Sequence, residues 1–180
     1  MAKVKTVSSK EPEEVSLNFY EFDQNNSGGS FDVTDKLCHR LIIQASSEKE
    51  AIRIAEDMGV YFDGCEKGID CDCCGDRWYS SSLIEIPKRY GTFTSEKANS
   101  IAGEYEAIVE ATNFKGRPIG KNGDREFDVV FDDVVKYAQY LTDSYGGWTS
   151  PDCRIFYKDG TVKEIYSSRI EEYSKKKKNK

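Results

Sequence analysis

The sequence predicts an α+β fold, in which a mixed or antiparallel sheet and two main helices are built from strand-helix units and carry a cysteine-rich loop. Three observations predict it. Two stretches place apolar residues at helical spacing, several shorter stretches alternate apolar and polar residues, and residues 63–78 gather four of the six cysteines. Because residues 63–78 offer few apolar side chains, a hydrophobic core alone is not expected to order them.

Length and composition predict one domain. The chain has 180 residues, 38% of them hydrophobic, which suits a single core over residues 16–167. That span has possible halves at 16–86 and 87–167. The polar residues 1–15 are expected to be disordered, and residues 168–180 to form a short helix and a basic disordered tail.

The charge is distributed unevenly. The formal net charge is −6, and five lysines among the last six residues leave residues 1–174 at −11. An acidic body disfavours a broad nucleic-acid-binding face, because such affinity comes mostly from cations that neutralise phosphates. No apolar stretch approaches the roughly 20 residues of a membrane helix, so we expect a cytosolic protein. In a reducing cytosol, cysteines are more readily free thiols or metal ligands than disulfides.

The first strand-helix unit begins with two strands. Residues 16–23 are rich in aromatics, residues 25–29 favour a turn, and residues 37–45 alternate apolar and polar positions. This order predicts an antiparallel hairpin with a broad loop. The helix that follows starts at a capping box, carries an apolar stripe and ends at a left-handed glycine; the residues concerned are Ser47, Glu50, Ala51, Ile54, Ala55, Met58 and Gly59.

The second half repeats the order of strand and helix. Residues 83–87 and 89–94 suit strands, residues 95–114 a short helix followed by a strand, and residues 115–123 a loop. A strand at 127–131 then precedes a helix capped by Asp132 or Asp133, with its apolar stripe at Val134, Tyr137, Ala138 and Leu141.

A hairpin closes the predicted domain. Residues 153–166 alternate on either side of Asp159 and Gly160, which predicts a primed turn between two strands. Whether the two strand-helix units are a true duplication stays open, because their sequences share only this general order.

The cysteine-rich loop predicts a metal site. Cys71, Cys74 and Gly75 have the C-x-x-C-G form of a zinc knuckle, in which two thiolates chelate one ion and the glycine permits a tight turn. We expect Cys65 and His39 to complete a structural zinc site, with Cys38, Cys73 and Cys153 as other possible ligands. Two alternatives remain: packed or redox-sensitive thiols without metal, and a catalytic metal. His39 also shares the apolar face of its strand, where a lone histidine is commonly a core residue.

Two groups of residues are candidates for binding a ligand or partner. The run Asn25, Asn26, Ser27, Gly28 and Gly29 could cradle an anion through backbone N–H groups, or be a plain turn. Asp76, Arg77 and Trp78 follow the knuckle and could form a stacking and anion-binding edge. In the alternative interpretation, Trp78 fills the core beneath the loop and Arg77 neutralises Asp70, Asp72 or Asp76.

The sequence predicts no catalytic residues. The single histidine, His39, is next to Cys38 but on the opposite face of the predicted strand, which disfavours a cysteine-histidine pair. No pair of carboxylates stands out for acid-base chemistry. Whether the chain is an enzyme therefore stays open, with binding the favoured interpretation.

Three stretches carry a resemblance to a known family. Residues 20–31, with the Asn-Asn-Ser-Gly-Gly run, residues 59–64, and residues 68–78, with C-D-C-C-G-D-R-W, resemble small accessory proteins of tailed bacteriophages. That family has no assigned activity, so no functional residue is carried over. The resemblance implies a protein of the host cell cytosol that acts on host machinery, including antiviral defence.

These observations lead to three hypotheses on function. The first is a non-enzymatic binding protein that blocks a host defence protein or sequesters a nucleotide-derived signal. The second is a zinc-stabilised, nucleic-acid-associated module that uses the knuckle, Arg77, Trp78 and the lysine tail. The third is an enzyme acting on a phosphate-containing substrate.

Overall fold

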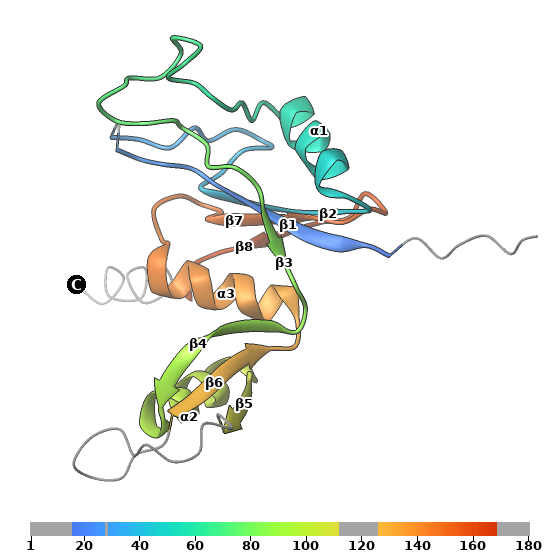
Figure 1. Cartoon of the computed structure of the whole chain (residues 1–180), viewed down its shortest axis with the longest axis vertical. Helices are drawn as coiled ribbons and strands as arrows, with labels where there is room; N and C mark the ends of the chain where they lie inside the picture. Colours follow the sequence, from blue (N-terminus) through green and yellow to red (C-terminus); the bar gives the residue numbers. More distant parts are fainter. Residues whose placement is uncertain (1–15, 28, 112–125, 169–180) are drawn as a thin grey trace, which may run out of the picture.

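A computed structural model of the chain describes residues 16–27, 29–111 and 126–168 (Figure 1). It confirms the predicted α+β class. Over these residues the chain forms three helices and eight strands, and the strands make one five-stranded and one three-stranded sheet. In the same residues, no helix combines the length and the apolar character that crossing a bilayer requires.

The five-stranded sheet is mixed. Its order is β3-β1-β2-β7-β8, in which only the β2–β7 pair is parallel. The predicted antiparallel hairpin of the first two strands is confirmed, with Asn18 opposite Ala45 and Asp23 opposite Arg40. The strands of this sheet are β1 (Asn18–Asp23), β2 (Arg40–Ala45), β3 (Ser82–Ile84), β7 (Cys153–Phe156) and β8 (Val162–Ile165).

The β7–β8 hairpin is confirmed, but its turn differs from the prediction. A primed turn needs a positive φ at its first central residue. Gly160 has φ 89°, whereas Asp159 is not among the residues with positive φ. The turn is closed by the Gly160 N–H, which donates to the Tyr157 carbonyl at 3.0 Å.

The three-stranded sheet is antiparallel, in the order β4-β6-β5. The helix α2 packs on it, so the predicted helix and strand within residues 95–114 are confirmed up to Ala111. Residues 112–114 and the predicted loop at 115–123 lie outside the described residues. The elements of this layer are β4 (Lys88–Thr94), α2 (Ser95–Tyr105), β5 (Ile108–Ala111) and β6 (Glu126–Phe131).

The helix α3 (Val134–Tyr145) lies between the two sheets, while α1 (Glu48–Met58) covers the other face of the five-stranded sheet (Figure 1). The chain leaves the first sheet after β3, builds the second, and returns through α3 to add β7 beside β2. The possible halves at 16–86 and 87–167 are therefore not two separate sheets, because residues 153–165 belong to the first.

The predicted capping residues lie at the helix ends, with one difference in their hydrogen bonds. The Ser47 hydroxyl accepts from the Glu50 N–H at 3.3 Å, and Gly59 ends α1 with φ 111°. The Glu50 carboxylate accepts from the N–H of Ser46 rather than that of Ser47, so the capping box is only half formed. Of the two possible caps of α3, Asp133 is used; its carboxylate accepts from the Val135 N–H at 2.6 Å.

Two apolar clusters lie on the two faces of the five-stranded sheet. One packs beneath α1 and the cysteine-rich loop, and it includes Phe22, Leu41, Ile43, Ala55 and Trp78. The other joins this sheet to α3, α2 and the second sheet, and it includes Ile42, Ile84, Phe131, Tyr137 and Ile155. The second cluster makes the two sheets share one core.

Charged side chains are buried between β1, β2 and α3. The Arg40 Nε lies 2.6 Å from Asp23 Oδ1 and 2.8 Å from Glu21 Oε1. The Tyr137 hydroxyl donates to Glu21 Oε2 at 3.4 Å. Arg40 and Glu21 are buried, whereas the Asp23 side chain is 31% exposed, so one buried cation is shared by a buried and a partly exposed carboxylate.

Candidate metal centre

The cysteine-rich loop, residues 63–78, connects α1 to β3 and is folded around two backbone carbonyls. The Gly64 carbonyl accepts from the N–H groups of Ile69 at 2.7 Å and Asp70 at 3.0 Å. The Cys71 carbonyl accepts from Cys74 at 2.8 Å and from Gly75 at 3.0 Å. Gly75 has φ 81°, the left-handed conformation that the knuckle prediction required of it.

Two carboxylates brace this loop from within. Asp70 accepts from the Arg77 N–H at 2.7 Å and from the Tyr61 hydroxyl at 2.8 Å. Asp76 accepts from the Cys65 N–H at 2.8 Å, and this hydrogen bond is the main reason why the pKa of Asp76 lies below its ordinary value. A Cβ on Gly64 would lie 1.9 Å from Asp70 Oδ2, so only glycine permits this approach.

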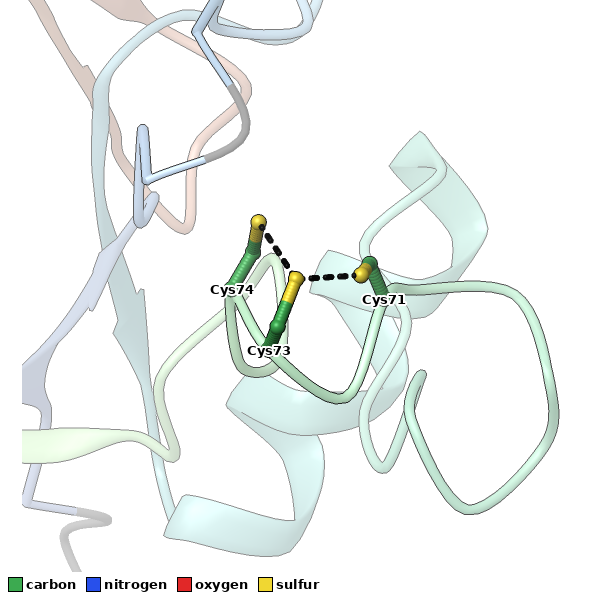
Figure 2. Close-up of side chains that lie close together, drawn as sticks. All are labelled: Cys71, Cys73 and Cys74. Atoms are coloured by element: carbon green, nitrogen blue, oxygen red, sulfur yellow. Dashed lines mark hydrogen bonds between the residues drawn. The ribbon is translucent and has the colours of Figure 1, made fainter.

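Three thiols form a group at the surface of the loop. The sulfurs of Cys71, Cys73 and Cys74 all lie within 4.8 Å of one another (Figure 2). The Cys73 Sγ is 2.7 Å from the Cys71 Sγ and 3.7 Å from the Cys74 Sγ. Tetrahedral zinc with Zn–S bonds of about 2.3 Å separates its sulfurs by about 3.8 Å. The Cys73–Cys74 distance fits one ion, whereas the Cys71 and Cys73 sulfurs would have to move apart by about 1 Å. The group could hold a metal ion.

The neighbours of these thiols favour one thiolate. The pKa of Cys71 lies below its ordinary value because the Cys73 thiol, and next the Cys73 backbone N–H, hydrogen-bond to its sulfur. The same pairing with Cys71, followed by that with Cys74, raises the pKa of Cys73 to about 11. Cys71 is thus the thiol prepared to lose its proton, which a metal ligand must do.

The predicted ligand set is only partly brought together. Cys71 and Cys74 belong to the group, Cys73 joins them, and Cys65 and His39 lie outside it. The Cys65 thiol donates to the Cys71 carbonyl at 3.6 Å. Desolvation and then the Asp76 carboxylate raise its pKa to about 11.

His39 is held in the core instead of reaching the loop. Its Nδ1 lies 3.5 Å from Asp152 Oδ2, and its ring contacts that of Phe31 with centroids 4.3 Å apart. Asp152 is fully buried, and its other oxygen accepts from the Gly147 N–H at 3.0 Å. The interpretation of His39 as a core residue is therefore the one that the structure supports.

The predicted anion-binding run is fastened to the cysteine-rich loop. The Asn25 side-chain amide donates to the carbonyls of Cys74 at 2.8 Å and Asp76 at 3.2 Å, and the Asn25 N–H donates to the Arg77 carbonyl at 2.7 Å. The Ser27 N–H donates to Asn25 Oδ1 at 2.9 Å.

One more backbone donor of this run, the Gly29 N–H, is also occupied. The Gly29 N–H donates to the Asn26 carbonyl at 2.8 Å. Gly28 lies outside the described residues. The N–H groups that an anion would need are thus used within the protein at Asn25, Ser27 and Gly29, which favours the plain turn.

Arg77 and Trp78 also join the two loops. The Arg77 guanidinium donates to the carbonyls of Asn25 and Ser30 and lies 3.8 Å from the Asp32 carboxylate. The predicted partners of its side chain, Asp70, Asp72 or Asp76, were wrong. Trp78 is 2% exposed and packs in the core beneath the loop, so its indole cannot form a stacking edge at the surface.

Comparison with known proteins places the chain in a family. The profile of a domain of unknown function, DUF7296, matches residues 17–127. The chain belongs to the DUF7296 family. The matched region contains both joined loops and five of the six cysteines, and it ends before α3, β7 and β8. No curated protein and no solved structure matches the chain.

Proposed function

We propose that this DUF7296 protein is a phage-encoded, non-enzymatic binding protein that blocks a host component, with a host defence protein as its target. One observation carries the proposal. Residues 24–27 and 29–34 lie far from residues 63–78 in the sequence, and Asn25 and Arg77 fasten them into one surface, called here the two-loop surface. The resemblance to tailed-phage accessory proteins supports the host context.

The composition of the two-loop surface suits a protein partner. Ile69 is 60% exposed, Val33 is 48% exposed, and Tyr79, directly after the loop, is 56% exposed. The cysteine-rich loop also exposes three acidic residues, Asp63, Glu66 and Asp72. Exposed apolar anchors within a polar rim are typical of protein interfaces, and the acidic rim suits a basic surface on the partner.

Zinc is the metal that we propose for the three-thiol group. Thiolate ligands and the knuckle turn suit zinc, which is redox-inactive and binds sulfur at about 2.3 Å. A bound ion would hold Cys71, Cys73 and Cys74 together. It would thereby fix the shape of the two-loop surface.

The experiment compares capture of a host partner by the wild-type protein and by Tyr79→Ala and Ile69→Ala variants. After the partner is identified and purified, its affinity should fall about tenfold or more for each variant, as expected for anchors in an interface. The matched control is Ile108→Ala, which removes a 43% exposed side chain from β5, in the second sheet. A partner that binds all variants equally would contradict the proposal.

The other hypotheses make different predictions. A nucleotide-derived signal should bind the purified protein in calorimetry. A nucleic-acid-associated module should lose affinity steeply as salt rises. Neither has the support of an observed site, because the N–H groups of Asn25, Ser27 and Gly29 are bound within the protein and the Trp78 ring is buried. An enzyme on a phosphate-containing substrate has still less support.

A further inference from the structure

We infer that a zinc ion held by Cys71, Cys73 and Cys74 keeps its fourth coordination position open at the surface, where a histidine or cysteine side chain of the bound protein fills it. The inference rests on the proposed function for the existence of that partner. Its first half, an open three-thiolate site, concerns this chain alone and can be tested without a partner.

The chain offers few sulfur or imidazole side chains that could act as a fourth ligand. All six cysteines and the one histidine lie within the described residues. Cys38, just before β2, and Cys153, in β7, are fully buried, and His39 is held between Asp152 and Phe31. Of the sulfur and imidazole donors outside the three-thiol group, only Cys65 therefore belongs to the same loop.

Cys65 is committed to the architecture of the loop. Its N–H is bound by Asp76 Oδ1 at 2.8 Å, and its thiol is directed to the Cys71 carbonyl at 3.6 Å. The same carbonyl closes the knuckle by accepting from Cys74 and Gly75. If the Cys65 sulfur moved into the group, it would give up this contact beside the turn that positions the other ligands.

The carboxylates of the loop do not complete the site either. Among the described residues, no Asp or Glu oxygen joins the three sulfurs within 4.8 Å. Both oxygens of Asp70 are used, by Arg77 and Tyr61, and Asp76 holds Cys65. These three carboxylate oxygens already accept hydrogen bonds within the protein.

The exposure of the group leaves room for a ligand from outside. Cys71 and Cys73 are exposed and Cys74 is half-buried. Figure 2 shows the three side chains at one turn of the loop, with the Cys73 sulfur between the other two. Zinc prefers four ligands in a tetrahedron and accepts water in a position that the protein leaves free. Imidazole nitrogen and thiolate sulfur are stronger ligands than water, so a partner's histidine or cysteine would replace it.

The test replaces zinc with Co²⁺ in the full-length protein and follows its visible spectrum during a titration with imidazole. We expect one Co²⁺ per chain, bands of a tetrahedral three-thiolate site, and a saturable spectral change as imidazole binds. Cys65→Ser should keep the stoichiometry, the bands and the imidazole response. Cys73→Ser should lower the Co²⁺ affinity about tenfold or more, since even loss of a residue that only supports a ligand costs that much.

The contrary results are equally specific. Bands of four thiolates that ignore imidazole and change in Cys65→Ser would mean a closed site and overturn the inference. Failure of the wild-type protein to bind Co²⁺ would also overturn it. Because this titration needs no partner, failure to capture a host protein would leave its result intact, and the two proposals can fail separately.

Discussion

Single residues in the buried ionic cluster make stability depend on pH. Glu21 lies among Asp23, Arg40 and Tyr137 in the core between the five-stranded sheet and α3. Burial, and next the charge of Asp23, raise the pKa of Glu21 from 4.5 to about 7, against the opposing effect of Arg40. The cost of desolvating a second carboxylate thus exceeds its attraction to a cation that Asp23 already neutralises.

This shift predicts the behaviour of a Glu21→Gln variant. Because the pKa is higher in the folded state than in the unfolded one, the contribution of Glu21 to stability is fully present below about pH 4.5 and is lost as pH rises through about 7. The neutral amide removes this loss. From pH 5 to pH 8, Glu21→Gln should therefore gain up to about 3 kcal/mol in unfolding free energy relative to the wild type.

Urea denaturation at a series of pH values measures this difference. Glu85→Gln, at an exposed position between the sheets, is the matched control and should follow the wild-type curve. If Glu21→Gln and the wild type lose stability in parallel over this range, the desolvation argument for Glu21 is wrong.

The loops show what a sequence can predict about an element and what it cannot. The caps at Ser47, Gly59 and Asp133 were predictable because each depends on residues within a few positions. The knuckle turn at Cys71, Cys74 and Gly75 was predictable for the same reason. Contacts between residues about 50 positions apart, such as that of Asn25 with Cys74, leave no local pattern.

The metal ligands illustrate the same limit. The C-x-x-C template counts only its first and last cysteine, so it leaves out Cys73 although Cys73 lies within the C-x-C-C run. Residue type alone points to His39 as a ligand. Its partner Asp152, 113 positions later in the sequence, could be identified only from the fold.

The attachment between the two loops can be tested with Asn25→Ala. The change removes two side-chain hydrogen bonds to the cysteine-rich loop, at the carbonyls of Cys74 and Asp76. We expect the unfolding free energy to fall by about 1–3 kcal/mol. Hydrogen exchange of the amides in residues 63–78 should accelerate, because among the described residues Arg77 is then the only side chain that donates hydrogen bonds from one loop to the other.

The adjacent Asn26→Ala is the control, since the Asn26 side chain is exposed. It should leave both the stability and the exchange of residues 63–78 close to wild type. Equal effects of the two substitutions would mean that the Asn25 amide does not fasten the loops.

At the scale of the whole molecule, α3 joins the two sheets into one core. Ile155 of the first sheet and Phe131 of the second belong to the same apolar cluster, and both are fully buried. This arrangement could not be predicted from the sequence. The alternation in residues 153–166 predicts a hairpin but not the sheet to which the hairpin belongs. Local periodicity determines an element, whereas the strand beside which a hairpin is added depends on the complete fold.

The shared core predicts that the two sheets unfold together. Ile155→Ala should lower the unfolding free energy by about 2–5 kcal/mol and Phe131→Ala by about 3–5 kcal/mol. Each variant should keep a single transition, at the same denaturant concentration by tryptophan fluorescence and by far-ultraviolet circular dichroism. Two transitions, or a variant that shifts only one probe, would mean that the sheets are independent units.

The parallel pairing of β2 with β7 affects how the chain is made. Residues 40–43 hydrogen-bond with residues 153–156, more than 100 positions later, beyond the end of the DUF7296 match at residue 127. At 5–20 residues per second, a ribosome needs roughly 5–20 s to supply that partner. During this interval the edge of β2 is open to strands of other nascent chains. A fragment cut at the boundary of the family match would keep that exposed edge permanently.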